Sequence, residues 1–128
     1  ISWTQKLSQL GIKYFSLADT IGVSNPENIS CMFSNLIPAL PGLEIGAHLH
    51  TTPDKWKEKV EAAYNSGCRS FDSAIKGFGG CPMASDKLTG NMPTENLLSF
   101  FEEKKIETGI DNKAFDAASL LALRTFPS

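Results

Sequence analysis

Two histidines, His48 and His50, lie close together in the segment EIGAHLHTTPDKW, and they are the only histidines of the chain. Residues i and i+2 of a β-strand point to the same side, so a strand here presents both imidazole rings to one space. Two ligands of one metal ion require that arrangement. The alternative is an incidental pair with no common ligand. The position of the pair at the end of a predicted strand, on its polar face, makes a metal site as good an interpretation as an incidental pair.

The glycine-rich segment GFGGCPMASDKLTGN is the second candidate, because it surrounds Cys81 and ends at Asn91. Glycine lets a backbone approach a ligand closely. A cation near Cys81 would lower the pKa of its thiol and make it a candidate acid or base. The alternative is a small buried hydrophobic residue, which is how we interpret Cys31 and Cys68. Asn91 offers a neutral oxygen ligand or, alternatively, a helix cap.

The rest of the chain must place these residues. We expect strands over 12–19, 43–50 and 68–77, and helices over 3–10, 26–40, 53–67, 93–105 and 112–123. Strands that alternate with helices through short connections predict an α/β fold with parallel strands. Polar residues gather near the carboxyl ends of the predicted strands, where parallel α/β folds place their functional sites. They are Asp19, His48, His50 and Asp72.

Composition narrows the class of protein. The chain has 128 residues, of which 41% are hydrophobic, and this size suits one compact domain. Its net charge of −2, without a basic stripe, argues against a nucleic-acid partner and favours small molecules or proteins. No apolar run is long enough for a membrane span, and the first residues lack a signal-peptide pattern, so we expect a soluble, intracellular protein. The three cysteines lack the number and spacing of a disulfide framework or zinc site.

Four segments together carry a family resemblance: SLADTIGV, AHLH, FDSAIKGFGGCP and TGNMPTENLL. In this order they resemble the carboxyl-terminal part of the 3-hydroxy-3-methylglutaryl-CoA lyase family of metal-dependent TIM-barrel enzymes. The most specific element is the glycine loop with its Cys-Pro pair, followed by Gly-Asn at positions 90 and 91. The resemblance implies the last three βα units of a (β/α)8 barrel. Residues 1–128 would then be a partial barrel from a longer catalytic domain.

The resemblance also implies a reaction and roles. The family cleaves 3-hydroxy-3-methylglutaryl-CoA, an acyl-CoA, to acetyl-CoA and acetoacetate with Mg²⁺ or Mn²⁺, in the bacterial cytoplasm or the mitochondrial matrix. It implies that the metal ligands are His48, His50 and Asn91, a mixed nitrogen and oxygen set that suits these ions. Cys81 would exchange a proton with the acetyl-CoA carbanion, and Asp19 and Glu95 would be acidic residues of the site.

The chain departs from the family pattern at three positions near the implied substrate pocket, with Thr51 in place of an acid, Lys59 in place of asparagine and Met83 in place of tyrosine. Three strands cannot close a barrel, so we expect a homo-oligomer or an association with the missing barrel half, including that of a split enzyme. Two other functions remain open. One is a Claisen-type condensing enzyme or aldolase of the same superfamily, and the other is a catalytically inactive association domain.

Overall fold

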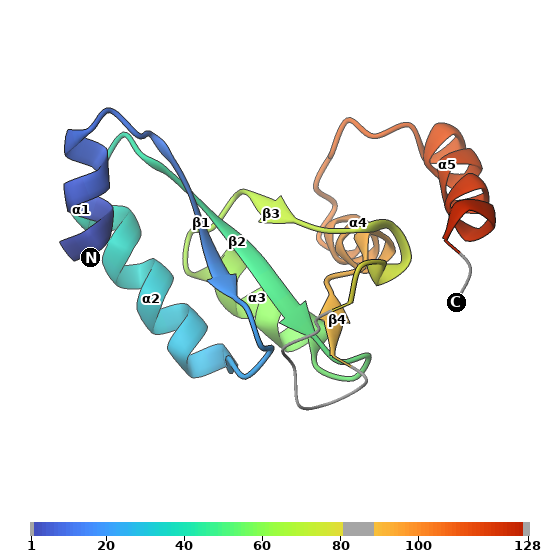
Figure 1. Ribbon diagram of the computed structural model, residues 1–128, viewed down its shortest axis with the longest axis horizontal. Helices are drawn as coiled ribbons and strands as arrows, with labels where there is room; N and C mark the ends of the chain where they lie inside the picture. Colours follow the sequence, from blue (N-terminus) through green and yellow to red (C-terminus); the bar gives the residue numbers. More distant parts are fainter. Residues whose placement is uncertain (1, 81–88, 127–128) are drawn as a thin grey trace.

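The computed structural model describes residues 2–80 and 89–126, in which helices and strands alternate over most of the chain (Figure 1). The order of elements follows the prediction, with one short additional strand, β4. In chain order the elements are α1 (Ser2–Gln9), β1 (Tyr14–Asp19), α2 (Pro26–Ala39), β2 (Glu44–Thr51), α3 (Trp56–Asn65), β3 (Phe71–Asp72), the 3₁₀ turn η1 (Ile75–Gly77), β4 (Gly90–Asn91), α4 (Thr94–Glu103) and α5 (Asn112–Thr125).

Strands β1, β2 and β3 form a parallel sheet, as predicted, and β2 lies in the middle. In this sheet His48 of β2 lies between Ala18 of β1 and Asp72 of β3. Strand β3 has two residues, so it is shorter than the strand expected over 68–77. Strand β4 runs antiparallel to the end of β2 and pairs Asn91 with His50. This pairing brings Gly90 and Asn91, the end of the glycine-rich segment, next to His50 and Thr51.

Helices α2 and α3 pack together against one face of the sheet and form the core with it. Alternation along β2 sends every second side chain into this core. The other face of β2 carries Gly46, His48 and His50, so the two histidines point away from the helices, as predicted. The core residues of these elements are Ile29, Phe33, Leu36, Ile45, Ala47, Leu49, Val60, Ala62 and Ala63.

The starts of α2 and α3 differ in how well the sequence predicts them. At α2 the side chain of Asn25 accepts a hydrogen bond from the Asn28 amide, and the side chain of Asn28 accepts one from the Asn25 amide. This capping box confirms the predicted start. Helix α3 begins at Trp56, so the start predicted at Pro53 is wrong. The Thr52 hydroxyl instead donates to the Asp54 carboxylate at 2.6 Å, and 52–55 form a turn.

The two described cysteines lie in different environments. Cys68 is buried, as predicted, and burial raises the pKa of its thiol to about 11. Cys31 is exposed, so the expectation that it is buried is wrong. Helix α2 buries the face that carries Ile29, Phe33 and Leu36, and Cys31 lies on the opposite face. Cys31 is therefore the more accessible of these two thiols.

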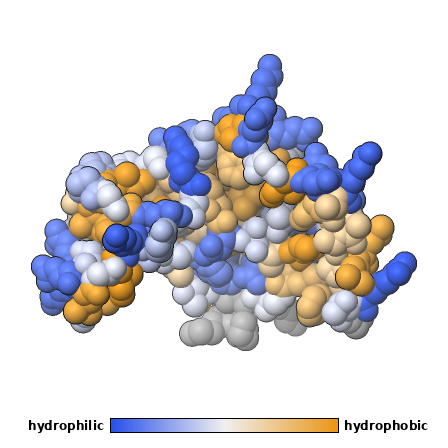
Figure 2. All heavy atoms as spheres, turned by 90° about the horizontal axis from the view of Figure 1, so that it is seen from above, coloured by the Kyte–Doolittle hydropathy of each residue, from blue (hydrophilic) through white to orange (hydrophobic). Residues whose placement is uncertain are grey.

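Apolar side chains remain exposed at both ends of the molecule (Figure 2). At the amino-terminal end, Tyr14 of β1 is 75% exposed. At the other end, α5 packs on the segment around η1, where the rings of Phe78 and Phe126 lie 5.5 Å apart, and it leaves Leu120 and Leu121 exposed. Among the described residues, no helix combines the length and the apolar character needed to cross a bilayer.

Candidate functional site

His48 is oriented by a carboxylate of the neighbouring strand. Its Nδ1 lies 3.2 Å from Oδ2 of Asp72, and the Ser16 hydroxyl donates to the same oxygen at 2.7 Å. A carboxylate oxygen accepts a hydrogen bond from Nδ1 when the His48 proton lies there, so this contact favours that tautomer. The lone pair of Nε2 is then available to a ligand.

His50 is held in the same tautomer by a different group. Its Nδ1 lies 3.0 Å from the backbone carbonyl oxygen of Asp19, which can only accept a hydrogen bond. The His50 ring therefore also offers the lone pair of Nε2. The two ring centroids are 5.2 Å apart, with the planes inclined at 68°. Both imidazoles thus present an acceptor nitrogen from one face of β2.

Asn91 lies beside this pair through the pairing of β4 with β2. Its amide nitrogen donates to the carbonyl oxygen of Phe78 at 2.8 Å, which leaves the amide oxygen Oδ1 as an acceptor. Gly79 permits this contact: its φ is 101°, and a Cβ there would lie 2.9 Å from the Asn91 side-chain nitrogen. Any larger residue would be strained and would displace Asn91.

Asp19 reaches the site through its backbone, while its carboxylate lies on the helix-facing side of β1. There it accepts a hydrogen bond from Lys59 at 2.9 Å and is bonded by the Ser24 hydroxyl. The Lys59 and Asp19 side chains are 2% and 8% exposed. Burial by itself raises the pKa of Asp19, but the hydrogen bonds from Lys59 and Ser24 and the Lys59 charge outweigh it and hold the pKa below its ordinary value.

Glu95 supports the turn that leads into the glycine-rich segment. Its carboxylate accepts a hydrogen bond from the backbone amide of Lys76 at 3.0 Å and lies 3.3 Å from the Lys76 ammonium. Lys76 adopts a left-handed backbone with φ 55°, which these contacts stabilise. Burial raises the pKa of Glu95, but its hydrogen bonds and the nearby ammonium outweigh that effect and lower it. Glu95 is therefore an ionised group that shapes the turn.

The structure therefore brings together three of the six predicted site residues, His48, His50 and Asn91, with Asp19 joining them through its carbonyl. Cys81 lies outside the described residues. Within 2–80 and 89–126 no group of three or more His, Cys, Asp or Glu side chains is arranged to hold a metal ion. The nitrogen ligands of a cation at this site would be the two histidines, with oxygen ligands from Asn91 and from other groups.

Two residues of the site, Asp72 and Lys59, received no role from the sequence. Asp72 follows the apolar Phe71 inside the strand predicted over 68–77, and this local pattern did not pair it with His48. Lys59 lies between Trp56 and Val60, on the apolar stripe of its helix, and a lysine in such a stripe is a signal of a buried cation with a partner. Recognising that partner required the fold.

An open hollow of about 520 Å³ borders the site and is large enough for part of a small-molecule ligand. Its wall includes Trp56, Lys76, Asn91 and Asn96. The hollow therefore presents an aromatic ring, an ammonium group and two amides beside one of the candidate metal ligands.

Comparison with known proteins places the chain in a family. The HMGL-like family matches residues 1–121. The chain is 36% identical over 110 residues to the (R)-citramalyl-CoA lyase of Chloroflexus aurantiacus, covering 86% of this chain and 34% of that protein. It is also 36% identical over 110 residues to the hydroxymethylglutaryl-CoA lyase of Pseudomonas mevalonii, and this match covers 86% of this chain and 36% of that protein. The chain thus spans about a third of the length of these relatives.

Among solved structures, the HMG-CoA lyase of Bacillus subtilis superposes with a TM-score of 0.87 at 29% identity. The match covers all of this chain and 44% of that chain. The order of parallel strands and helices found here is therefore that of one part of a TIM-barrel lyase.

Proposed function

This chain belongs to the HMGL-like family, and from that premise we propose that it forms the carboxyl-terminal part of a divalent-metal-dependent carbon–carbon lyase. The proposed reaction cleaves 3-hydroxy-3-methylglutaryl-CoA to acetyl-CoA and acetoacetate. A relative that bears the name of this activity is 36% identical to the chain over 110 residues, which supports the reaction class.

The observation that carries the proposal is the matched orientation of the two imidazoles. Each ring is bonded at Nδ1, by the Asp72 carboxylate at 3.2 Å and by the Asp19 carbonyl at 3.0 Å. Ring nitrogens held by such outer partners are typical of histidines that bind a metal through the other nitrogen. An incidental pair of histidines has no reason to share this arrangement.

The donor set fits Mg²⁺ or Mn²⁺. His48 and His50 would supply nitrogen and Asn91 its side-chain oxygen, a mixture that manganese and magnesium accept when carboxylate, water or substrate oxygens complete the shell. Metal dependence is general in the HMGL-like family. When bound, a divalent cation would act as a Lewis acid that polarises substrate oxygens and orients the substrate.

The chain's own residues would orient the substrate and move one proton. A base removes the proton of the substrate's tertiary hydroxyl, and the carbon–carbon bond then breaks. Acetoacetate is released, and the carbanion of acetyl-CoA remains. The Cys81 thiol then donates its proton to that carbanion. Asp19 orients His50 through its carbonyl oxygen, and Glu95 fixes the turn at Lys76 through the 3.0 Å contact to its amide.

The test is a lyase assay of the protein with 3-hydroxy-3-methylglutaryl-CoA and Mg²⁺ or Mn²⁺. We expect acetoacetate to form, and we expect the His48→Ala variant to lose most of that activity because it removes one ligand. Cys31→Ser, on the exposed side of α2, is the matched control. Metal binding without cleavage would favour a condensing enzyme or aldolase of the same superfamily. Absence of both would favour an inactive association domain.

A second substrate is favoured by one observation, the 36% identity to a citramalyl-CoA lyase. By the family resemblance, the departures at Thr51 and Met83 bear on the choice of acyl group, so the same ligand set could serve a different 3-hydroxyacyl-CoA. The assay therefore includes (R)-citramalyl-CoA in parallel. If (R)-citramalyl-CoA is cleaved faster than 3-hydroxy-3-methylglutaryl-CoA, it is the preferred substrate, and the reaction class stays the same.

Replacing Asp72 by asparagine tests the orientation of His48. Asparagine keeps the size of the side chain but can turn its amide nitrogen toward Nδ1, which would favour the opposite tautomer of His48. We expect Mn²⁺ affinity to fall about 10–100-fold, the usual effect of losing an outer-shell partner. Isothermal titration with Mn²⁺ measures this, and an unchanged Kd would remove Asp72 from that role.

We further propose that the exposed edge of β1 is covered by other barrel strands or by a second copy of the chain. Among the described residues, β1 pairs with β2 and has no strand on its other side. An unpaired edge and the exposed Tyr14 favour such an association. Residues 1–128 are proposed to be one part of a longer catalytic domain, with an acyl-CoA as its small-molecule partner. The proposed compartment is the bacterial cytoplasm or the mitochondrial matrix.

A further inference from the structure

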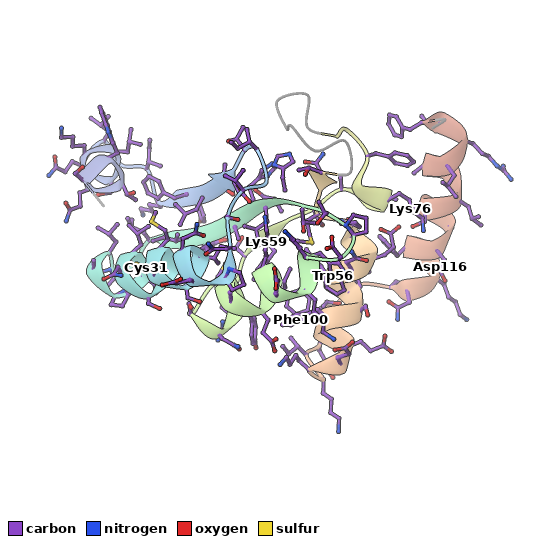
Figure 3. The ribbon with its side chains drawn as sticks, turned by 90° about the horizontal axis from the view of Figure 1, so that it is seen from below. Cys31, Trp56, Lys59, Lys76, Phe100 and Asp116 are labelled. Atoms are coloured by element: carbon purple, nitrogen blue, oxygen red, sulfur yellow. The ribbon has the colours of Figure 1, made fainter. Side chains whose placement is uncertain are left out.

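Lys59 is the most deeply buried charged side chain of the described residues, at 1% exposure, and the proposed reaction gives it no role. It extends from α3 toward the ends of the strands, in the middle of the molecule (Figure 3). A lysine that is fully buried needs partners for its charge and for its three N–H donors. The identity of those partners points to its role.

The Lys59 ammonium has three acceptors, each within 3.0 Å. They are the carboxylate of Asp19 at 2.9 Å, the carbonyl of Gly22 at 3.0 Å and the carbonyl of His50 at 3.0 Å. Three donors therefore meet three acceptors, and the charge of Lys59 is neutralised by Asp19. The acceptors belong to the end of β1, to the loop after it and to the end of β2.

Each of these acceptors also fixes a part of the candidate metal site. Asp19 makes two contacts: its carboxylate pairs with the Lys59 ammonium, and its backbone carbonyl orients the His50 ring. The Gly22 backbone packs against Thr89, since a Cβ at Gly22 would lie 2.5 Å from a Thr89 methyl group. Thr89 directly precedes Gly90 and Asn91 of β4. One ammonium group thus connects the segments that carry His50 and Asn91.

We propose that Lys59 is a positioning residue that sets the tautomer and place of His50 for metal binding. This inference rests on the proposed metal site. The ammonium holds the peptide groups of His50 and Gly22 and the side chain of Asp19, so the Asp19 carbonyl remains beside Nδ1 of His50. His48 depends on Asp72 instead and is independent of Lys59.

The experiment compares Lys59→Met with Lys57→Met by two measurements. Lys57 lies on the same helix in a half-exposed ion pair with Glu103, so it is the matched control. Long-range ¹H–¹⁵N spectra of the metal-free protein report the tautomer of each histidine. In Lys59→Met we expect His50 to become a mixture of tautomers while His48 keeps its signal, and Mn²⁺ affinity to fall about 10-fold or more. Lys57→Met is expected to match the wild type in both.

A double variant, Lys59→Met with Asp19→Asn, separates positioning from simple charge compensation and serves also if the single variant does not fold. It buries no unpaired charge but still lacks the bonds to Gly22 and His50. We expect the mixed His50 tautomers to persist. A wild-type His50 signal and wild-type Mn²⁺ affinity in the double variant would overturn the proposal. If the wild type itself binds no Mn²⁺, the proposed function fails, while the tautomer measurement still decides the role of Lys59.

Discussion

Replacement of Cys81 by serine in the full-length protein is expected to lower kcat about 10²–10⁴-fold, the usual contribution of a positioned general acid or base. The expected change in KM is small. Serine keeps the size of the side chain, but its hydroxyl is a far weaker acid than a thiol, so protonation of the carbanion becomes slow. Steady-state kinetics with the preferred acyl-CoA measures both constants.

The exposed Cys31 supplies the control for this substitution, because Cys31→Ser changes a thiol on the outer face of α2 and is expected to leave both constants unchanged. A Cys81→Ser variant that binds its substrate less tightly but turns it over at the wild-type rate would assign Cys81 to substrate binding and take away its role as proton donor.

Asp19→Ala is expected to lower the free energy of unfolding by about 3–5 kcal/mol, because it leaves the Lys59 ammonium buried and unpaired. The two side chains are 2% and 8% exposed, so water cannot replace the lost carboxylate without a rearrangement. The lowered pKa of Asp19 means that the ion pair is present at neutral pH and is lost as the pH falls through that value. Urea unfolding followed by circular dichroism at pH 7 measures the difference.

Glu103→Ala is the matched control for Asp19→Ala. It breaks the ion pair between Lys57 and Glu103, which is as short, at 2.7 Å, but about half exposed. Exposed pairs of this kind contribute less than about 1 kcal/mol. If the two substitutions lower the free energy of unfolding equally, the Lys59 ammonium becomes hydrated when Asp19 is removed. The buried ion pair would then stabilise the fold no more than the exposed one.

The sequence predicted the parallel α/β arrangement and the common face of His48 and His50 because both depend on simple periodicities. It missed β4 because a two-residue strand has no periodicity to detect; its pairing with β2 depends on a contact distant in the sequence. The same limit applies to the pair formed by Lys59 and Asp19, whose positions are 40 residues apart. Local patterns predict which face a residue occupies, but they do not name its partner.

The placement of Asp19 has a more specific explanation. Its position at the end of a predicted strand indicated that it belongs to the site. Alternation along β1, however, places it on the same side as Phe15 and Leu17, which face the helices, while Ser16 lies on the side of His48 and Asp72. The carboxylate therefore contacts Lys59, and its role as an acidic residue of the site stays a prediction.

The pairing of β4 with β2 places His50 and Asn91 next to each other through main-chain hydrogen bonds, such as the 3.2 Å bond from the Met92 amide to the Leu49 carbonyl. Peptide groups are the same whatever side chains surround them. Substitutions in the walls of the adjoining hollow can therefore accumulate during evolution without altering the spacing of His50 and Asn91, the two proposed ligands. Relatives that act on different acyl groups can share one catalytic centre, and selection for a new substrate need not rebuild it.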